Sequence, residues 1–332
     1  MKQTTIALIG YGYWGPNVAR NIYRNKQLDF RYICDLKSDR LDLARGLYAN
    51  EVLYTNSFED VLNDSEVDAV ALAVETSSHY ALAKQAILAG KHVYVEKPFT
   101  DNVEQAEQLK ALAEEHDVVI HVDHIMIYHP AVKKIKEIID GGDIGDVIYY
   151  DCSRINLGKV KNDVSCMWDL SVHDLSIIDY LSDGIPVKAV QAMGKRIYSS
   201  KESVTFVSAD YGNFVATIKA NWISPIKERK LIVAGTKKML VYDDVDVLNK
   251  LIVYDKGFDV VGDDDIEYDE FVVKARTGDG SIPKLDSGDA LYNSIEHFRQ
   301  CIERRCKSMS GPDAAIRVLS VLELADRNMV SE

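Results

Sequence analysis

The sequence predicts an α/β fold in which a doubly wound parallel sheet is followed by an α+β domain with an open, mostly antiparallel sheet. Three observations predict it. An apolar run enters a glycine turn and then an amphipathic stretch, strand-like and helix-like runs alternate as far as residue 122, and strand-like runs then follow one another without helices between them. Strict alternation is typical of a parallel sheet covered on both faces, whereas consecutive strands are typical of an antiparallel sheet.

The first strand and the first helix are joined by a glycine turn. Residues 6 to 9 form an apolar run of strand length that leads into Gly10-x-Gly12-x-x-Gly15. In the Rossmann arrangement the first glycine permits a tight turn, the second lets the backbone approach a pyrophosphate, and the third lets helix and strand pack closely. The N-terminus of the helix then faces the anion. The candidate cofactor contacts in this loop are Gly10, Gly12, Tyr13, Trp14 and Gly15.

An acidic residue decides between a dinucleotide site and a simple glycine-rich hairpin. Asp35 ends the next apolar run, twenty residues after Gly15. A carboxylate at this position would bind the ribose hydroxyls and would repel a 2′-phosphate. We therefore expect the cofactor to be NAD, with NADP disfavoured.

The rest of the first domain continues the alternation. Gly90 ends one helix-like stretch, and a further apolar run follows it directly. We expect an NAD-binding Rossmann domain over residues 1–122 and a substrate-binding and oligomerisation domain over residues 123–332. In the first domain, helices are expected at 38–48, 57–62, 78–89 and 102–116, and strands near residue 52 and at 69–74, 92–95 and 118–122.

The second domain reads as helices on one face of an open sheet. The other face of such a sheet either meets the first domain or pairs with another subunit. Residues 243–270 are acidic. We interpret them as a solvated edge or loop and not as a calcium site, because the EF-hand spacing is absent. Strands are expected at 147–154, 187–197, 203–210, 214–222, 230–235 and 239–242, and helices at 131–140, about 169–181, 289 to about 305, and 312–327.

Composition excludes several classes of function. The chain has 332 residues, enough for two domains, and 39 basic against 52 acidic residues give a net charge of −13, which disfavours a general nucleic-acid binder. We find no apolar run long enough to span a bilayer, and because the first strand begins within a few residues of the start we expect no signal peptide. Five cysteines without a C-x-x-C pair suggest reduced thiols in a cytoplasm, and neither Cys34 nor Cys166 has an identifiable activating partner.

A lysine follows the fifth strand of the expected sheet. In an open parallel sheet, ligands bind outside the carboxyl ends of the strands, so Glu96-Lys97-Pro98 should face the ligand. The Lys97–Pro98 bond can be cis at low energetic cost, which would aim the lysine. The alternative is a solvent-exposed lysine in a turn.

The second candidate lies on a helix of the second domain. Asp169 and His173 stand four residues apart, as neighbours on one helix face do, and Tyr180 continues that stripe. An imidazole can remove a hydroxyl proton while hydride passes to a nicotinamide, and Lys97 as an ammonium would stabilise the charge that develops on the same oxygen. The alternative makes Asp169 a helix cap and His173 a partly buried, hydrogen-bonded side chain.

Two further groups of polar residues follow strands four and six. His121, Asp123 and His124 include zinc-ligand types, but on a strand end His121 and Asp123 share a face while His124 points away. We therefore expect no metal. The segment from Thr76 to His79 is expected to line the nicotinamide side or to cap its helix.

These motifs, in this order, resemble the glucose-fructose oxidoreductase, inositol dehydrogenase and rhizopine-catabolism (Gfo/Idh/MocA) family. The resemblance rests on residues 10–17, Glu96-Lys97-Pro98 and the Asp169-x-x-x-His173 helix, and it covers nearly the whole chain. It implies that Lys97, Asp169 and His173 act on a sugar or polyol hydroxyl. It also implies an open sheet used for contacts in a homodimer or homotetramer.

Further stretches resemble the nucleotide-sugar and surface-polysaccharide branch of that family. They are residues 154–159, 168–177, 221–225, 227–229 and 241–244. The resemblance makes Arg154, Asn156, Lys159 and Tyr180 candidates for the substrate side, although they are equally compatible with surface positions. Two departures from the family pattern bear on the shape of the nicotinamide pocket: Asp123 replaces an expected small residue, and residues 75–77 replace a proline-containing turn.

The leading hypothesis is an NAD-dependent oxidoreductase acting on a ring hydroxyl of a sugar, with a nucleotide sugar preferred. One alternative keeps the cofactor and makes the net reaction glycoside hydrolysis through transient oxidation. Another is a non-catalytic, NAD-sensing protein, which has no need of Lys97 or His173.

Overall fold

The chain forms two compact units. The computed structural model describes residues 3–48, 51–260 and 273–331. The first unit combines Met1–His129 with Gly288–Ser320, and the second combines Pro130–Ser287 with Val321–Glu332. A single boundary at residue 122 does not anticipate the return of residues 288–320 to the first unit. Helix α9 (Pro312–Arg327) therefore begins in the first unit and ends in the second.

The first unit is built on a six-stranded parallel sheet in the order β3-β2-β1-β4-β5-β6. Every neighbouring pair in it runs parallel, which confirms the predicted doubly wound sheet. The strand order reverses between β1 and β4, and ligands bind outside the carboxyl ends of strands at such a point. The strands are β1 (Thr4–Ile9), β2 (Leu28–Cys34), β3 (Leu53–Thr55), β4 (Ala69–Leu72), β5 (His92–Val95) and β6 (Ile120–Val122).

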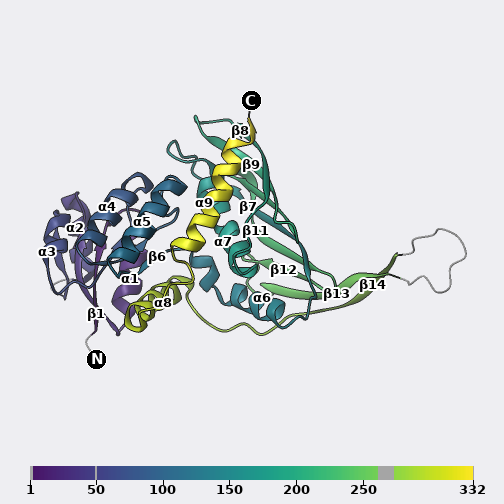
Figure 1. Cartoon of the computed structure of the whole chain (residues 1–332), viewed down its shortest axis with the longest axis horizontal. Helices are drawn as coiled ribbons and strands as arrows, with labels where there is room; N and C mark the ends of the chain where they lie inside the picture. Colours follow the sequence, from purple (N-terminus) through teal and green to yellow (C-terminus); the bar gives the residue numbers. More distant parts are fainter. Residues whose placement is uncertain (1–2, 49–50, 261–272, 332) are drawn as a thin grey trace, which may run out of the picture. The chain divides into compact units, whose positions relative to one another are not determined.

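Helices cover this sheet, as Figure 1 shows. Strands β1 and β4 are buried along their whole length, as expected of strands covered on both faces. A helix from the C-terminal segment, α8, packs against α1, and its Ile295 and Phe298 join the core formed by α1 and β1. No helix among the described residues is both long and apolar enough to cross a membrane. The helices are α1 (Gly15–Arg24), α2 (Ser38–Tyr48), α3 (Phe58–Asn63), α4 (Thr76–Leu88), α5 (Val103–Glu115), η2 (Ile125–Tyr128) and α8 (Ala290–Arg304).

The second unit is built on a nine-stranded mixed sheet in the order β14-β13-β12-β11-β7-β10-β9-β8-β15. Neighbouring strands are antiparallel except for the pairs β10–β7 and β15–β8, so the predicted open, mostly antiparallel sheet is confirmed. The strands are β7 (Val147–Leu157), β8 (Ala189–Arg196), β9 (Glu202–Asp210), β10 (Val215–Asn221), β11 (Ile223–Gly235), β12 (Met239–Asp243), β13 (Leu251–Val260), β14 (Val273–Ser281) and β15 (Met329–Ser331).

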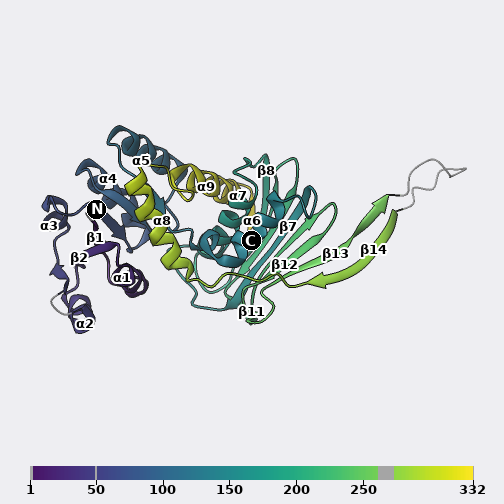
Figure 2. The same ribbon diagram turned by 90° about the horizontal axis from the view of Figure 1, so that it is seen from below.

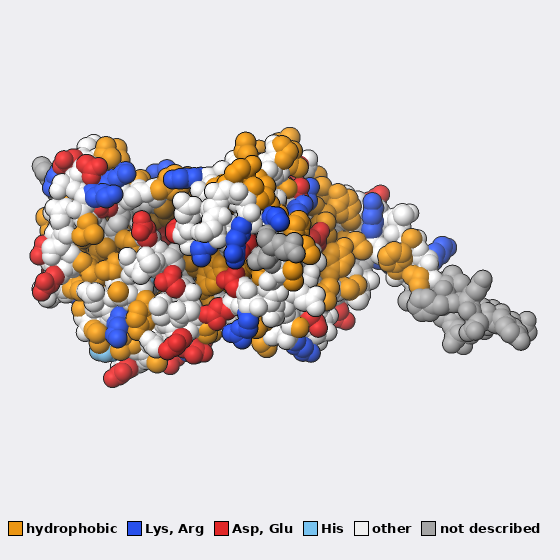
Figure 3. Space-filling model, turned by 90° about the horizontal axis from the view of Figure 1, so that it is seen from above, with side chains coloured by type: hydrophobic (Ala, Val, Ile, Leu, Met, Phe, Trp, Pro, Cys, Tyr) orange, Lys and Arg blue, Asp and Glu red, His pale blue; other side chains and the backbone are white. Residues whose placement is uncertain are grey.

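The two faces of this sheet differ. Helices α6 (Pro130–Asp140) and α7 (Val172–Leu181) lie on one face, as Figure 2 shows. Buried and exposed side chains alternate along β8 and β10, and exposed apolar residues include Met193, Phe206 and Val215. In Figure 3, hydrophobic side chains gather on the second unit beside the base of the β13–β14 hairpin. The sheet therefore keeps an apolar surface outside its own core.

The acidic stretch contains a strand that the sequence interpretation missed. Residues 251–260 form β13, which pairs with β12 and β14, where a solvated edge or loop was expected. The acidic composition masked the apolar residues that open this strand, Leu251-Ile252-Val253-Tyr254. Asp263, Asp264 and Asp265, which belong to the same expected loop, lie outside the described residues.

Candidate functional site

The three glycines of the loop serve two purposes: two of them allow close packing, and one leaves space for a ligand. Gly10 has a φ of +95°, and a Cβ there would lie 2.4 Å from the carbonyl oxygen of Ala73. A Cβ at Gly15 would lie 2.4 Å from the carbonyl oxygen of Gly10. At Gly12 a Cβ would meet nothing within 4 Å. The fold therefore requires the first and third glycines, while the second borders open space that a pyrophosphate can approach.

Asp35 is held beside this loop at the carboxyl end of β2. Its Oδ2 accepts a hydrogen bond of 2.7 Å from the backbone N–H of Tyr11, and its Oδ1 accepts one of 2.8 Å from that of Lys37. Each carboxylate oxygen has a second lone pair, so the fixed carboxylate can also accept from two vicinal hydroxyls. Tyr13 is exposed, and Trp14 occupies the N-cap position of α1 without a side-chain hydrogen bond to the helix. This donor and acceptor set fits the diphosphate and ribose of a dinucleotide.

A pair of carboxyl groups lies beside Lys97. Glu96 follows β5, Asp123 follows β6, and the Lys97–Pro98 peptide is cis. Glu96 Oε1 and Asp123 Oδ2 are both inaccessible to solvent. Burial and the neighbouring Asp123 raise the pKa of Glu96 well above its usual range, and burial also raises the pKa of Asp123. Because two buried carboxylates repel each other, the pair retains a proton more readily than an isolated carboxyl group does.

His124 adds a neutral imidazole to the same region. The side chain is buried, and burial followed by the nearby charge of Lys97 lowers its pKa to about 3. Neither ring nitrogen has a hydrogen-bond partner among the described residues. A buried unpaired polar group costs about 1–3 kcal/mol, so a ligand that hydrogen-bonds this ring would recover that energy. The sequence pointed to His124 only as a metal-ligand type.

His79 joins two loops of the first unit. Its Nδ1 lies 2.9 Å from the carbonyl oxygen of Pro98, and its Nε2 lies 3.3 Å from that of Val74. The ring is buried, and it does not cap α4, whose first residue is Thr76. His79 therefore fixes the segment that follows Lys97, and a direct contact with the cofactor remains a prediction for both Thr76 and His79.

Asp169 and His173 lie where two kinds of helix meet. Met167–Ser171 forms a π-helical turn, η3, that leads directly into α7, whereas a continuous α-helix was expected. Asp169 sits inside this turn and forms an ion pair of 2.8 Å with Lys161, so it is not a helix cap. His173 lies half-buried in the first turn of α7. Single π-turns occur frequently at functional sites.

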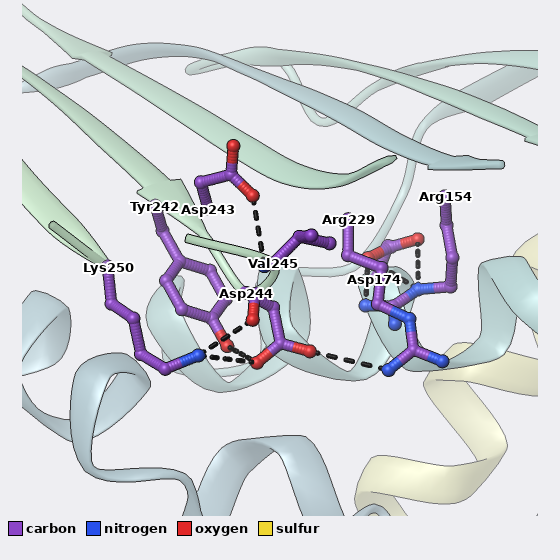
Figure 4. A network of polar contacts seen from close by, with 8 residues as sticks. All are labelled: Arg154, Asp174, Arg229, Tyr242, Asp243, Asp244, Val245 and Lys250. Carbon is purple, nitrogen blue, oxygen red and sulfur yellow. Dashed lines mark hydrogen bonds and ion pairs between the residues drawn. The ribbon is translucent and has the colours of Figure 1, made fainter. Parts of the chain in front are cut away.

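Arg154 is committed to a buried ion pair, as Figure 4 shows. Its Nη2 lies 2.7 Å from Asp174 Oδ1, and its Nε lies 3.0 Å from Asp174 Oδ2. The two side chains are only 7% and 3% exposed. The pair links β7 to α7. A substrate would have to compete with Asp174 for the guanidinium of Arg154, where the sequence predicted a substrate contact. Asp174 was missed, although a carboxylate among the apolar residues Ile177, Ile178 and Leu181 signals a buried partner.

A second polar group in Figure 4 surrounds Asp244. Its carboxylate accepts a hydrogen bond of 3.1 Å from Tyr242 Oη and lies 3.4 Å from both Arg229 Nη1 and Lys250 Nζ. Among the remaining substrate-side candidates, Asn156 is half-buried on β7, Lys159 is exposed beyond its end, and Tyr180 is half-buried on α7.

The predicted site residues therefore fall into two groups. One group lies in the first unit, in the segments that follow the carboxyl ends of the parallel strands and in the first turns of α1 and α4: Gly10, Gly12, Tyr13, Trp14, Gly15, Asp35, Thr76, His79, Glu96 and Lys97. The other group belongs to the second unit and comprises Arg154, Asn156, Lys159, Asp169, His173 and Tyr180.

Known proteins resemble both units. The family model for the GFO/IDH/MocA oxidoreductase family, NAD-binding Rossmann fold, matches residues 4–124, and the model for the GFO/IDH/MocA C-terminal domain matches residues 132–241. The solved structure of UDP-N-acetylglucosamine 3-dehydrogenase GnnA from Acidithiobacillus ferrooxidans superposes with a TM-score of 0.81 at 25% identity, covering 99% of this chain and 98% of that chain.

Curated relatives show the same likeness in sequence. UDP-N-acetylglucosamine 3-dehydrogenase of Acidithiobacillus ferrooxidans is 29% identical over 245 residues, covering 72% of this chain and 71% of that protein. The scyllo-inositol 2-dehydrogenase (NAD(+)) of Bacillus subtilis is 25% identical over 319 residues, covering 90% of this chain and 86% of that protein. The match to the uncharacterized oxidoreductase YrbE of Bacillus subtilis, 28% identical, spans 58% of that protein's length. The chain belongs to the GFO/IDH/MocA family of oxidoreductases, with an NAD(P)-binding Rossmann domain and the C-terminal domain of that family.

Proposed function

We propose that this protein is an NAD-dependent oxidoreductase that transfers hydride between the nicotinamide and a ring hydroxyl of a nucleotide-linked sugar. The observation that carries the proposal is the glycine loop, with open space at Gly12 and a fixed carboxylate at Asp35, in the same unit as Lys97. These residues suit a dinucleotide and a reacting group at the carboxyl ends of the same sheet.

The chemistry divides between the cofactor and the chain. The nicotinamide, when bound, accepts or donates hydride. Lys97 as an ammonium donates a hydrogen bond to the substrate oxygen and stabilises the negative charge that builds on it. His173 takes the hydroxyl proton, and Asp169 orients the substrate or the imidazole. By exchanging a proton with the same oxygen, Lys97 offers a second route for that proton.

The likeness to relatives guides the choice of substrate class. The relative matched over 245 residues is named for a UDP-sugar, and another is named for scyllo-inositol, a cyclic polyol. Both substrates carry secondary ring hydroxyls. We place nucleotide sugars first, because residues 154–159, 168–177 and 221–225 resemble that branch in sequence.

A substrate panel tests the proposal directly. Absorbance of the reduced cofactor is followed with free sugars, inositols, and UDP- and dTDP-sugars, with NAD and NADP in parallel. We expect NADH to accumulate with at least one nucleotide sugar. Glycoside cleavage without NADH accumulation would instead support transient oxidation, and cofactor binding without turnover on any class would refute the proposed activity.

The preference for NAD has its own test at Asp35. Asp35→Asn keeps an oxygen that can accept from Tyr11 and removes the charge that would repel a 2′-phosphate. We expect the ratio of kcat/KM for NADP to that for NAD to rise about tenfold, equivalent to about 1.4 kcal/mol. The exposed surface variant Asp42→Asn is the control. An unchanged ratio in Asp35→Asn would remove the main argument for NAD.

We also propose that the open face of the nine-stranded sheet pairs with a second copy of the chain. Met193, Phe206 and Val215 leave large apolar side chains exposed on neighbouring strands, and burying such surface favours association. Multi-angle light scattering measures the mass in solution. A single-chain mass at working concentration would contradict this assembly.

A further inference from the structure

A line of hydrogen bonds crosses the interior of the first unit. Ser308 Oγ lies 2.9 Å from His121 Nδ1, and His121 Nε2 lies 2.9 Å from Ser294 Oγ. Ser294 Oγ then donates to Asp123 Oδ1 at 2.9 Å. His121, Ser294 and Asp123 are buried, whereas Ser308, in the segment after α8, is partly accessible to solvent. The line therefore connects the end of β6 with the surface.

The donors and acceptors along this line have one consistent direction. Because Asp123 accepts from the Ser294 hydroxyl, that hydroxyl accepts from His121, which places the ring proton on Nε2. Nδ1 is then the acceptor for the Ser308 hydroxyl. A more distant hydroxyl, Ser310 Oγ, lies 3.4 Å from Nε2. Ser308, His121 and Ser294 thus each hold one proton and have a lone pair to receive the next, and in this orientation protons pass inward to Asp123.

His121 is suited to pass protons without trapping them. Burial, followed by the neighbouring His297 and His124, lowers the pKa of His121 well below its usual range, so the ring is neutral. A neutral imidazole can accept a proton at one nitrogen while it releases one from the other. The titratable groups that face the ring are Tyr94, Asp123, His124, Tyr128 and His297.

The inner end of the line reaches the carboxyl pair beside Lys97. Burial raises the pKa of both Glu96 and Asp123, each carboxyl group acts on the pKa of the other, and the charge of Lys97 lowers both pKa values. The pair can therefore accept a proton from the direction of Lys97 at one carboxyl group and exchange one with Ser294 at the other. A purely structural network has no need of an outlet at the surface, but this line ends at a partly accessible hydroxyl.

We propose that Glu96, Asp123, Ser294, His121 and Ser308 form a proton relay that links Lys97 with solvent. The inference rests on the proposed function, in which Lys97 contacts the reacting oxygen. During oxidation the carbon loses hydride to the nicotinamide, and the oxygen loses its proton. Lys97 gives one ammonium proton to the carboxyl pair and takes the proton of the substrate oxygen in its place. For outward transfer the hydroxyls and the His121 ring first take the opposite orientation, so that Asp123 donates to Ser294, Ser294 to Nε2 and Nδ1–H to Ser308, which releases a proton to water. Reduction uses the path inward in the orientation described above, and Ser308 then takes a proton from water.

Two substitutions of equal shape at Ser308 test the relay. Ser308→Thr keeps the hydroxyl, whereas Ser308→Val removes it and fills the same space against water. We expect kcat to fall about tenfold or more in Ser308→Val relative to Ser308→Thr, with KM unchanged and a larger solvent deuterium isotope effect. Equal kcat and equal isotope effects in the two variants would overturn the relay.

A second measurement needs no turnover. Infrared spectroscopy of the cofactor-free protein detects the protonated carboxyl group of the pair, and Glu96→Gln and Asp123→Asn assign its band. After transfer to D₂O, we expect this band to shift about tenfold more slowly in Ser308→Val than in Ser308→Thr. Equal exchange rates would overturn the relay even if the protein proves to have no dehydrogenase activity.

His121 provides an internal check on both measurements. Glutamine at this position can accept one hydrogen bond and donate another, but it does not exchange protons between two ring nitrogens. His121→Gln should keep the cooperative unfolding of the wild type. Its kcat, its solvent isotope effect and the exchange rate of its carboxyl band should match those of Ser308→Val. A folded His121→Gln variant with unchanged isotope effect and exchange rate would also contradict the proposal. Turnover by the wild type, measured separately, decides the proposed function itself.

Discussion

Replacing Lys97 by alanine is expected to lower kcat on an authentic sugar substrate by about a hundred- to a thousandfold, the usual loss when one donor to a developing oxyanion is removed. The physical reason is the proposed contact of its ammonium with the substrate oxygen, at the carboxyl end of β5. KM for NAD should change much less, because the glycine loop and Asp35 remain in place. Steady-state kinetics at saturating NAD measure both quantities.

The control for this variant is an exposed lysine of the same unit. Lys84→Ala removes a positive charge from the surface of α4 and should leave kcat as in the wild type. His173→Asn tests the other half of the proposed chemistry and should also lower kcat by about a hundredfold or more. If Lys97→Ala and His173→Asn both turned over at the wild-type rate, the catalytic assignment would be wrong.

Removing one partner of the Arg154–Asp174 pair is expected to destabilise the second unit by about 3–5 kcal/mol. Both side chains are almost fully buried, so either single variant leaves an uncompensated charge in a medium that solvates it poorly. Arg154→Met combined with Asp174→Leu should recover most of the loss, because it removes both charges and fills the space. Urea unfolding followed by tryptophan fluorescence measures these differences.

The matched control is a half-exposed pair on the same sheet. Lys230 Nζ lies 3.4 Å from Asp243 Oδ2, with side chains 37% and 27% exposed. Lys230→Ala should change the free energy of unfolding by at most about 1 kcal/mol. A substrate role for Arg154 would appear differently: the double variant would be stable but would show a raised KM for the sugar. A loss below about 1 kcal/mol in Asp174→Ala would contradict the structural role.

The first unit was largely predictable because its signals are local. The bounds of α2 and β5 agree with the sequence analysis, and the glycine loop leads directly into α1, as expected. Apolar periodicity and turn residues act over a few positions, so short windows contain the information. The exception is the segment 288–320, whose place in the first unit depends on contacts with residues far earlier in the chain, such as those of Ile295 and Phe298.

The second unit was harder because composition and tertiary contacts outweighed local pattern. Because residues 243–270 are rich in charge, β13 was not predicted. Strand β11 runs from Ile223 to Gly235, whereas a strand was expected only at 230–235. At residues 223–229 polar and apolar positions mix, and pairing with β7 decides the strand. The π-turn at Met167–Ser171 gave no recognisable signal either, since its residues are compatible with an ordinary α-helix.

By itself the sequence determined the parallel sheet, the dinucleotide loop with Asp35, and the positions of Lys97 and His173 in the chain. Each of these is indicated by a pattern of residues that are close together in the sequence. Only the tertiary structure decided the partners of the buried charges. Ser294 donates to Asp123 across 171 positions, and Asp174 neutralises Arg154. A buried polar group takes whichever partner the fold brings within hydrogen-bond distance, and no local pattern records that choice.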